Sequence, residues 1–462
     1  MTIISNLIEL GFLFCASGFF VSLKLLSSPK TARLGNALGA FSMLLAIFLS
    51  FVEIKFSSIF LIMIIIGFGA LVGAVIAYKI KMTAMPQLVA VLNGLGGSAS
   101  VLVALSDAMK IFHDATSFSL LFIITSWLSV IIGAITFTGS IVAYLKLEDI
   151  IPTRPMLFMG LRWVTVFVFL ICLGFLFILL NGPKNMEAFV MVSIFSGILG
   201  ILLVIPIGGA DMPVVISLLN SYSGMAALAA GFLVKSNLLI ISGSLVGASG
   251  IILTRLMCQA MNRSLFNVIF GAFGGIEIKH AHGEEKAMRE FLPEDAVMLL
   301  ANARKVILVP GYGLAVSQAQ RNLKELADEL RSRGIQIFYA IHPVAGRMPG
   351  HMNVLLAEAD VSYDDLYDLD SINSEFETAD VAIILGANDV VNPLARTDKD
   401  SPLFGMPILN ADKAKTVLVL KRGKGRGFSG VENPLFTLDN VGLIFGDAKS
   451  SLIKILNALR KY

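Results

Sequence analysis

Long apolar runs occupy most of the first half of this chain. A membrane-spanning helix needs about 20 largely apolar residues, and charged residues are nearly absent from 1–275. The pattern predicts a polytopic α-helical membrane domain over 1–263. About nine spans are expected, at 3–26, 34–52, 58–78, 86–106, 117–145, 163–181, 187–207, 212–234 and 237–259.

The pattern changes in the last third of the chain, where short apolar runs alternate with amphipathic ones. Such alternation is typical of strands and helices that build a doubly wound parallel sheet. It predicts a C-terminal α/β Rossmann-like domain over 296–462, joined to the spans by an interfacial segment and linker at 264–295. Strands are expected at 304–310, 335–341, 381–385, 416–421 and 442–446, with helices in 311–334 and 447–462.

Composition supports this division and excludes several classes of protein. Of the 462 residues, 56% are hydrophobic and 15% are charged, against about 25% charged in soluble domains. A net charge of +3 without a basic stripe disfavours nucleic-acid binding. The three cysteines form no CxxC pair and the histidines lack ligand spacing, so we expect neither disulfides nor a metal site. The N-terminus lacks a cleavage pattern and is expected to be a retained span.

Loop charges predict how the spans are oriented. Cytoplasmic loops carry an excess of Lys and Arg, and one alternate set of loops here is clearly richer in them. The rule places the N-terminus outside and the C-terminal domain in the cytoplasm. The richer set contains Lys24, Lys30, Arg33, Lys79, Lys81, Lys146, Arg154, Arg162 and Arg263, and the poorer set contains Lys55, Lys110, Lys184 and Lys235.

Four polar residues lie where lipid-facing side chains are unfavourable. Asp211 opens one span and Asn220 lies within it, while Asn93 and Ser140 belong to two other spans. Polar groups inside a bilayer are costly and often mark ion or proton pathways. Two alternatives stay open: Asp211 before Met212-Pro213 suits a helix N-cap, and the amides suit hydrogen bonds between helices.

A glycine turn follows the first expected strand of the C-terminal domain. It reads Gly311-Tyr312-Gly313-Leu314-Ala315-Val316, a G-x-G-x-x-V variant of the dinucleotide fingerprint. NAD sites of this type carry an acid after the second strand, but here His342 stands there. Lys421-Arg422 after a later strand suits a 2′-phosphate, although a solvated basic loop has the same sequence.

Two further loops follow expected strand ends. The loop 342–351 holds Arg347, which suits a phosphate, and the loop 386–393 holds Asn388 and Asp389, which suit the ribose or the nicotinamide. Both loops are equally compatible with ordinary turn chemistry, because Gly, Asn, Asp and Pro are the usual turn residues.

Several runs together resemble one known family. They are GGADMPVVISLLNSYSG, PGYGLAVSQAQ, IHPVAGRMPGHMNVLLAEA, GANDVVNP, GMPIL, KRG…GFSGVENPLF and LIFGDAK. They are similar to the beta subunit of proton-translocating NAD(P)+ transhydrogenase, and the likeness covers essentially the whole chain.

The resemblance implies a function and a set of partners. Hydride passes directly between NADH and NADP+, coupled to proton translocation across the bacterial inner membrane. This chain then binds NADP(H), whereas an alpha subunit binds NAD(H) and adds further spans, in an alpha2–beta2 assembly with a beta–beta contact. No side chain acts as a chemical catalyst.

The resemblance also implies roles for individual residues. Asp211 and Asn220 match residues tied to coupling, and residues 423–433 match a lid over the nucleotide. The residues expected at the cofactor are Gly311, Tyr312, Gly313, Ala315, Val316, His342, Val344, Ala345, Gly346, Arg347, Gly386, Asn388, Asp389, Lys421, Arg422, Gly427, Phe428, Ser429 and Gly430.

Two positions depart from the family pattern. Asn93 stands where many members carry a histidine, and because asparagine cannot titrate, we expect a partner-subunit residue to share the proton work with Asp211. Phe428 replaces a usual tyrosine in the lid, where Lys424 and Arg426 add charge.

Two rival functions remain at this point. One is an ion transporter or channel gated by a nucleotide-sensing Rossmann domain, and the other is a membrane anchor for a dehydrogenase. The missing acid after the second strand and the absence of a TVGYG-type filter disfavour the first. The polar residues within the spans disfavour the second.

Overall fold

The computed structural model describes most of the chain and divides it into two compact units. The first holds most of the long apolar helices, and the second holds the α/β region. The described residues are 2–28, 31–53, 59–113, 119–153, 155–182, 185–261, 264–270, 288–347, 350–399, 401, 403–423, 425, 427 and 429–462.

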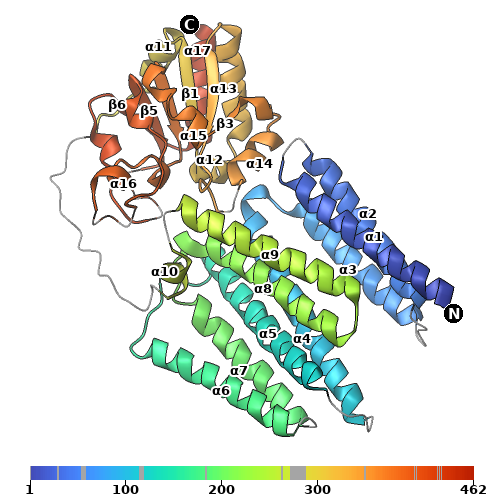
Figure 1. The fold of residues 1–462 in the computed structure, drawn as a ribbon. Coiled ribbons are helices and arrows are strands. Elements are labelled where there is room, and N and C mark those ends of the chain that lie inside the picture. The colour runs from blue at the N-terminus through green and yellow to red at the C-terminus, as the bar shows by residue number, and fades with distance from the viewer. Residues whose placement is uncertain are drawn as a thin grey trace. The chain divides into compact units, whose positions relative to one another are not determined.

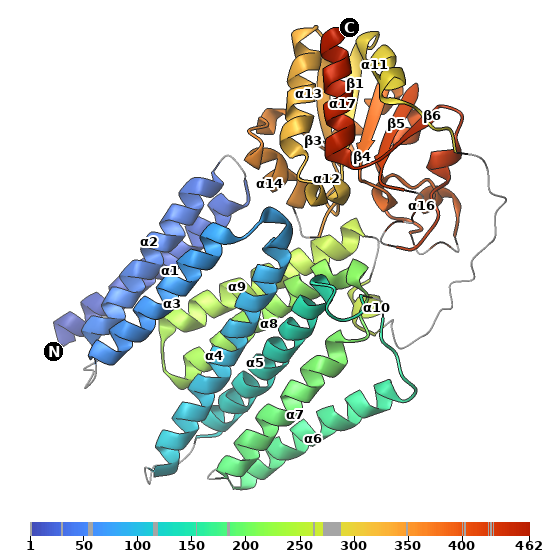
Figure 2. The same ribbon diagram turned by 180° about the vertical axis from the view of Figure 1, so that it is seen from behind.

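Within these residues, nine helices are long and apolar enough to cross a membrane, which confirms the predicted membrane architecture. Figures 1 and 2 show α1 beside α2 and α4 beside α5. The bounds are α1 Thr2–Leu26, α2 Ala32–Glu53, α3 Ile59–Lys79, α4 Met85–His113, α5 Leu120–Leu147, α6 Leu161–Asn181, α7 Met186–Val204, α8 Met212–Leu233 and α9 Asn237–Ala260. A short helix, α10 Leu265–Phe270, follows.

Several helix ends differ from the sequence expectation, most clearly those of α4 and α5. The helix α4 continues past residue 106 to His113, because an Asp107–Lys110 ion pair of 3.1 Å stabilises its polar last turn. The helix α5 begins at Leu120, where the hydroxyl of Ser119 accepts a hydrogen bond from the Phe122 amide at 3.2 Å. It ends at Leu147, so Lys146 belongs to the helix rather than to the loop.

Close approach of glycines holds α4 against α5. A Cβ placed on Gly97 would lie 2.6 Å from the carbonyl oxygen of Gly133, and one placed on Gly133 would meet that of Gly97 at the same distance. Only residues without a side chain let two helices approach so closely. The Gly69–Gly73 pair of α3 faces open space among the described residues, so it makes no such contact within this chain.

The α/β region is a six-stranded parallel sheet in the order β3-β2-β1-β4-β5-β6, which confirms the doubly wound prediction. The buried strands are nearly continuous apolar runs, as expected when helices cover both faces. Their bounds are β1 Lys305–Pro310, β2 Gln336–Ile341, β3 Leu366–Asp368, β4 Val381–Leu385, β5 Thr416–Lys421 and β6 Val441–Phe445.

Two hydrophobic cores enclose this sheet, one on each face. Figure 2 shows α13 and α17 side by side on one face, and short helices with 3-10 turns cover the other. The helices are α11 Pro293–Ala301, α12 Tyr312–Val316, α13 Gln320–Ser332, α14 His351–Glu358, α15 Leu369–Ile372, α16 Leu394–Thr397 and α17 Ala448–Lys461.

The single helix expected within 311–334 is two helices. The chain leaves the helical conformation after Val316, and Gln318 takes a left-handed φ of 50° before α13 begins at Gln320. The apolar pattern runs on through this break because Leu314 and Ala319 both face the core. The pattern alone therefore could not reveal two helices.

Candidate functional site

The strand order reverses between β1 and β4, and this point carries the candidate site. In open parallel sheets, ligands bind beyond the carboxyl ends of the strands where the order reverses. The loops that begin at Gly311 and Gly386 follow β1 and β4 directly. The loops after β2 and β5 lie at the same edge, and all four contribute residues to one pocket.

Glycines let the β1 and β4 loops touch each other. The amide of Gly313 donates to the carbonyl of Gly386 at 3.0 Å, and Gly386 has a left-handed φ of 67°. A Cβ on Gly313 would lie 2.7 Å from the Cα of Gly386, and one on Gly311 would lie 2.5 Å from the Cα of Ala387. The glycines of the fingerprint thus allow the backbones of the two loops to pack closely at the switch point. They also leave the pocket edge free of side chains.

The loop after β2 begins with a buried histidine. The Nε2 atom of His342 lies 2.7 Å from the carbonyl oxygen of Pro407, and its Nδ1 lies 3.2 Å from the amide of Val344. The amide can only donate, so Nδ1 accepts and Nε2 carries the proton of a neutral ring. Burial lowers the pKa of His342 to about 4. His342 therefore fixes the loop 342–347 and presents no negative charge where NAD sites carry an acid.

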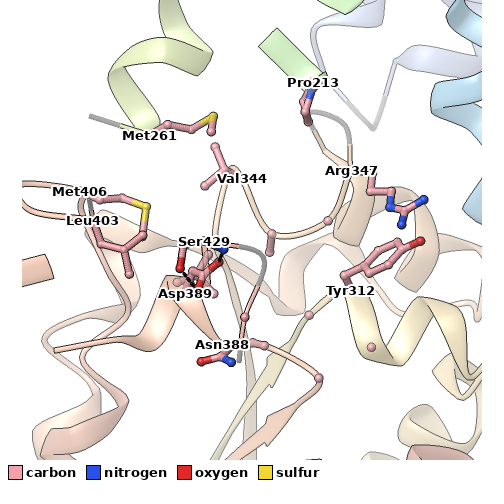
Figure 3. Close-up of a pocket in the computed structure, with 18 of the residues that line it drawn as sticks. Pro213, Met261, Tyr312, Val344, Arg347, Asn388, Asp389, Leu403, Met406 and Ser429 are labelled. Carbon is pink, nitrogen blue, oxygen red and sulfur yellow. Dashed lines mark hydrogen bonds between the residues drawn. The ribbon is translucent and has the colours of Figure 1, made fainter. Parts of the chain in front are cut away.

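Arg347, Tyr312 and His351 form a cluster beside the glycine turn. The guanidinium of Arg347 lies 4.6 Å from the centre of the Tyr312 ring, an arrangement that Figure 3 shows. The backbone amide of Arg347 donates to Nδ1 of the buried His351 at 3.1 Å, and the two rings meet edge to face at 6.0 Å. Stacking on the tyrosine holds one cation at the pocket edge.

Asp389 joins the β4 loop to the segment 429–433. Its carboxylate accepts from the amide of Ser429 at 2.9 Å and from the Ser429 hydroxyl at 2.7 Å (Figure 3). Asn433 donates to both the carbonyl and the side-chain oxygen of Asn388 at 3.0 Å, and Asn392 donates to the carbonyl of Glu432 at 3.0 Å. The described part of the expected lid is thus attached to one loop at the switch point.

Two basic residues follow β5 in different surroundings. The ammonium of Lys421 lies 4.3 Å from the centre of the Phe436 ring, and burial lowers the pKa of Lys421. Arg422 is 62% exposed and lies 3.9 Å from Asp447, too far for a hydrogen bond. Lys421 lines the pocket, whereas Arg422 extends into solvent.

The structure brings most of the expected cofactor residues together but not all of them. Ala315 is buried in the core, and Val316 is 40% exposed. His342 does not line the pocket but supports its loop through a hydrogen bond with the carbonyl of Pro407. Gly430 lies beside the pocket lining, and Phe428 lies outside the described residues. The expected residues that do line the pocket are Gly311, Tyr312, Gly313, Val344, Ala345, Gly346, Arg347, Gly386, Asn388, Asp389, Lys421, Gly427 and Ser429.

Sequence reasoning missed several apolar residues of the pocket, among them Ala387, Val390, Leu403 and Met406. Leu403 and Met406 follow no strand directly, so the rule that ligands bind beyond strand ends does not find them. Their only signal was the GMPIL run at 405–409, which contains Met406 and begins two residues after Leu403. Among the described residues, no cluster of His, Cys, Asp or Glu could hold a metal ion.

The polar residues of the membrane helices lie on three different helices. Asn93 of α4 is buried and donates to the carbonyl of Ile216 in α8 at 3.2 Å. Ser140 of α5 is buried, and its Cβ lies 3.2 Å from the position that a Cβ on Gly94 of α4 would take. Asn220 lies in α8 and Asp211 ends the 3-10 turn just before it, and both are half-buried.

Comparison with known proteins identifies the family. A family model described as NAD(P) transhydrogenase beta subunit matches residues 8–458. The chain belongs to this family. Two curated relatives named NAD(P) transhydrogenase subunit beta, both from Rhodospirillum rubrum, are 46% identical over 448 residues, which is 96% of this chain and 96% of each relative.

Membership confirms the resemblance that the sequence motifs carried. In its described residues, this transhydrogenase beta chain has nine apolar helices long enough to cross a membrane, together with a Rossmann-like domain. The family implies a transhydrogenase role and the use of nicotinamide nucleotides, and the name beta subunit implies a partner alpha subunit.

Proposed function

We propose that this chain is the NADP(H)-binding and membrane subunit of a proton-pumping transhydrogenase. In this proposal an alpha subunit binds NAD(H), and hydride passes directly between NADH and NADP+ while protons cross the membrane. One observation supports it most. The described part of this chain joins nine apolar helices, with polar residues among them, to a Rossmann-like domain whose switch point is lined by glycines and basic residues.

The residues at the switch point fit a nicotinamide nucleotide that carries an extra phosphate. Gly311, Gly313 and Gly386 leave backbone exposed for a pyrophosphate. Lys421 and Arg347 supply positive charge at the pocket edge, and no carboxylate follows β2 to hold a free 2′-hydroxyl. This charge pattern favours NADP(H) over NAD(H) on this chain.

The chemistry of hydride transfer belongs to the two bound nucleotides, so no protein acid or base is required. The residues of this chain bind and orient the NADP(H) and cover it with the loop 423–433. With only one nucleotide domain present, the second nucleotide must come from the alpha subunit. We further propose an alpha2–beta2 assembly with a beta–beta contact, placed in the bacterial inner membrane with this domain in the cytoplasm.

Proton coupling is assigned to the membrane helices. Asp211 is the one titratable residue in the set formed with Asn93, Ser140 and Asn220. Coupling between two sites is reciprocal, so the redox state of NADP(H) must then change the proton affinity in the membrane. Since Asn93 cannot titrate, a residue of the partner subunit is proposed to share the proton with Asp211.

The test uses inverted membrane vesicles that contain this chain and its alpha partner. NADPH-driven reduction of an NAD+ analogue and acidification of the lumen are followed together. We expect both, and we expect both to vanish when the alpha subunit is omitted. Hydride transfer without acidification would refute the pump and keep the enzyme. If neither occurs while the C-terminal domain binds NADPH, a nucleotide-gated transporter becomes the better reading.

A further inference from the structure

A fully buried lysine lies at the end of α5. Lys146 has no exposed surface, and its ammonium donates to the carbonyl oxygens of Ile205 and Ile207, each at 2.6 Å. Among the described residues, no carboxylate lies within ion-pair distance of this ammonium. A buried ammonium is costly unless it is well hydrogen-bonded, so contacts with two carbonyls alone require an explanation.

The two carbonyls belong to the end of α7 and the turn that follows. The helix ends at Val204, and Pro206 cannot continue it because it lacks an amide hydrogen. The last carbonyls of any helix lack partners within the helix and carry its partial negative charge. Where protein or lipid excludes water, such carbonyls must find donors within the protein. The ammonium of Lys146 therefore acts as a cationic cap on α7.

This cap determines the course of the connection between α7 and α8. It holds residues 205 and 207 from a neighbouring helix, and the 3-10 turn Gly209–Asp211 follows at once. The amide of Met156 also donates to the carbonyl of Ile205, at 3.4 Å. The ammonium of Lys146 thus holds the backbone at Ile205 and Ile207, and Asp211 lies only four residues after Ile207.

We propose that Lys146 is a positioning residue for proton coupling, because it holds the connection that carries Asp211. This proposal rests on the proposed function, since it assigns Lys146 a role in the coupling there given to Asp211. Without the ammonium, the carbonyl of Ile207 loses this donor and that of Ile205 keeps only the long contact with the Met156 amide, so the turn is free to rearrange. Hydride transfer, which belongs to the nucleotides, continues, while the protons moved per hydride fall.

The first measurement compares acidification with hydride transfer in the vesicles that hold both subunits. Lys146→Met, which keeps the side-chain length and removes the charge, is expected to lower the ratio of acidification to hydride transfer severalfold, because Asp211 is no longer held in place. Lys146→Arg, which keeps a donor cation, should recover part of the ratio. The matched control is Lys79→Met, at an exposed lysine in the last turn of α3, and it should leave the ratio unchanged.

A second measurement follows the connection itself. A Cβ on Gly208 would meet only Pro155, at 3.4 and 3.5 Å, which is ordinary contact, so Gly208→Cys should be tolerated. The three native cysteines are buried. Maleimide should label Cys at this position several times faster when Lys146 is Met than when it is Lys. If Lys146→Met fails to accumulate, Lys146→Gln, which is neutral but polar, takes its place in both measurements.

The outcomes separate the two proposals. Wild-type vesicles without acidification refute the pump itself. With a pumping wild type, an unchanged ratio in the Lys146 variants overturns the positioning role even if total activity falls. A lower ratio with unchanged labelling overturns the cap as its cause. A lower ratio together with faster labelling supports the proposal.

Discussion

Single residues around the pocket differ sharply in how firmly they are fixed. His342 is buried with both ring nitrogens bonded, whereas Arg422 of the same site region is mostly exposed. A buried neutral histidine reports on the stability of the folded domain, because unfolding returns it to water and to its ordinary pKa. Substitution of an exposed arginine instead changes the affinity for a ligand that the arginine contacts. Two predictions at this scale follow these two behaviours.

The stability of the C-terminal domain should fall as the pH drops below about 6.5, the ordinary pKa of histidine. The pKa of His342 is lowered to about 4, so the unfolded chain binds a proton that the folded domain does not. The neutral ring contributes its full stability above 6.5, and about 3 kcal/mol of it is lost on approaching 4 at 1.36 kcal/mol per pKa unit. Urea unfolding of residues 288–462 between pH 4.5 and 7.5 measures this loss.

The loss of stability between pH 4.5 and 6.5 can be assigned to His342 once the other titrating groups are considered. His351 is the second histidine of these residues, and burial followed by the charge of Arg347 lowers its pKa too, so it adds loss of the same sign. Hydrogen bonding to Lys415 lowers the pKa of Asp380 below its ordinary value of 3.8, so its contribution is lost only at lower pH. His342→Gln should flatten the curve between 4.5 and 6.5. An equally steep curve in that variant would contradict the assignment.

Removing the charge of Lys421 and Arg422 should weaken NADPH binding far more than NADH binding. A hydrogen bond to a charged group contributes about 1.5–3 kcal/mol, so the double variant should lose about tenfold or more in NADPH affinity. The control is Lys415→Ala, at the opposite end of β5 in an ion pair with Asp380. Equal losses for both nucleotides, measured by equilibrium titration, would argue against a 2′-phosphate site.

At the scale of elements, loops at one edge of the sheet hold each other in place. The loop after β4 contacts the glycine turn after β1 and also binds residues 429–433. Changing either contact should alter the site through loop geometry rather than through direct contact with a ligand.

Gly313→Ala should destabilise the domain and weaken nucleotide binding together. The new Cβ would lie 2.7 Å from the Cα of Gly386, and backbone cannot yield as a side-chain end can, so one loop must move. Overpacking of this kind typically costs about 1–3 kcal/mol. Gly423→Ala is the control for thermal unfolding, because its Cβ meets nothing within 4 Å among the described residues. Thermal unfolding that is unaltered in Gly313→Ala would contradict the contact.

Breaking the attachment of the lid should speed the release of NADPH. Asp389→Ala removes both hydrogen bonds from Ser429, and Ser429→Ala removes the one from the hydroxyl. Bonds to a carboxylate are worth about 1.5–3 kcal/mol, so release should be about tenfold faster in the aspartate variant and less affected in the serine variant. Stopped-flow fluorescence of bound NADPH measures this, with the exposed Ser362→Ala as control. Release rates equal to that of the wild type in both variants would show that the attachment does not retain the nucleotide.

Sequence patterns predicted the long elements well and the short ones poorly. Nine spans and five strands are runs long enough for periodicity to identify them. The strand β3, Leu366–Asp368, has three residues and no such signal, and the break at Gln318 interrupts no apolar pattern. Lys146 was counted as a loop charge, because a lysine that ends a span has the same sequence whether it faces water or caps a neighbouring helix.

The candidate site shows the same limit. Residues that follow long strands, such as Gly311 and Asp389, were predicted from the rule for parallel sheets. Leu403 and Met406 reach the pocket from a segment without strands, and the attachment of Ser429 to Asp389 joins residues 40 positions apart. Such contacts depend on how loops fold back, which no local pattern records.

At the scale of the whole molecule, the proposed pump requires that a proton step in the helices changes nucleotide handling in the α/β domain. Asp211→Asn is the most direct probe of that link, because it keeps the size of the side chain and removes its charge and its titration. The variant should abolish acidification in vesicles with both subunits or stall turnover altogether, depending on which state of Asp211 the amide resembles. Since coupling is reciprocal, the affinity for NADPH should also lose its dependence on pH.

Two comparisons make this result interpretable. Lys110→Met changes an exposed charge that pairs with Asp107 at the end of α4, and it should leave both acidification and the pH dependence of NADPH affinity intact. Asn220→Asp would place a carboxylate in α8, nine residues beyond Asp211 along the chain. Pumping that persists at the wild-type ratio in Asp211→Asn would mean that the proton never resides on Asp211. The titrating group would then lie on the partner subunit alone, and Asp211 would be left with the role of starting α8.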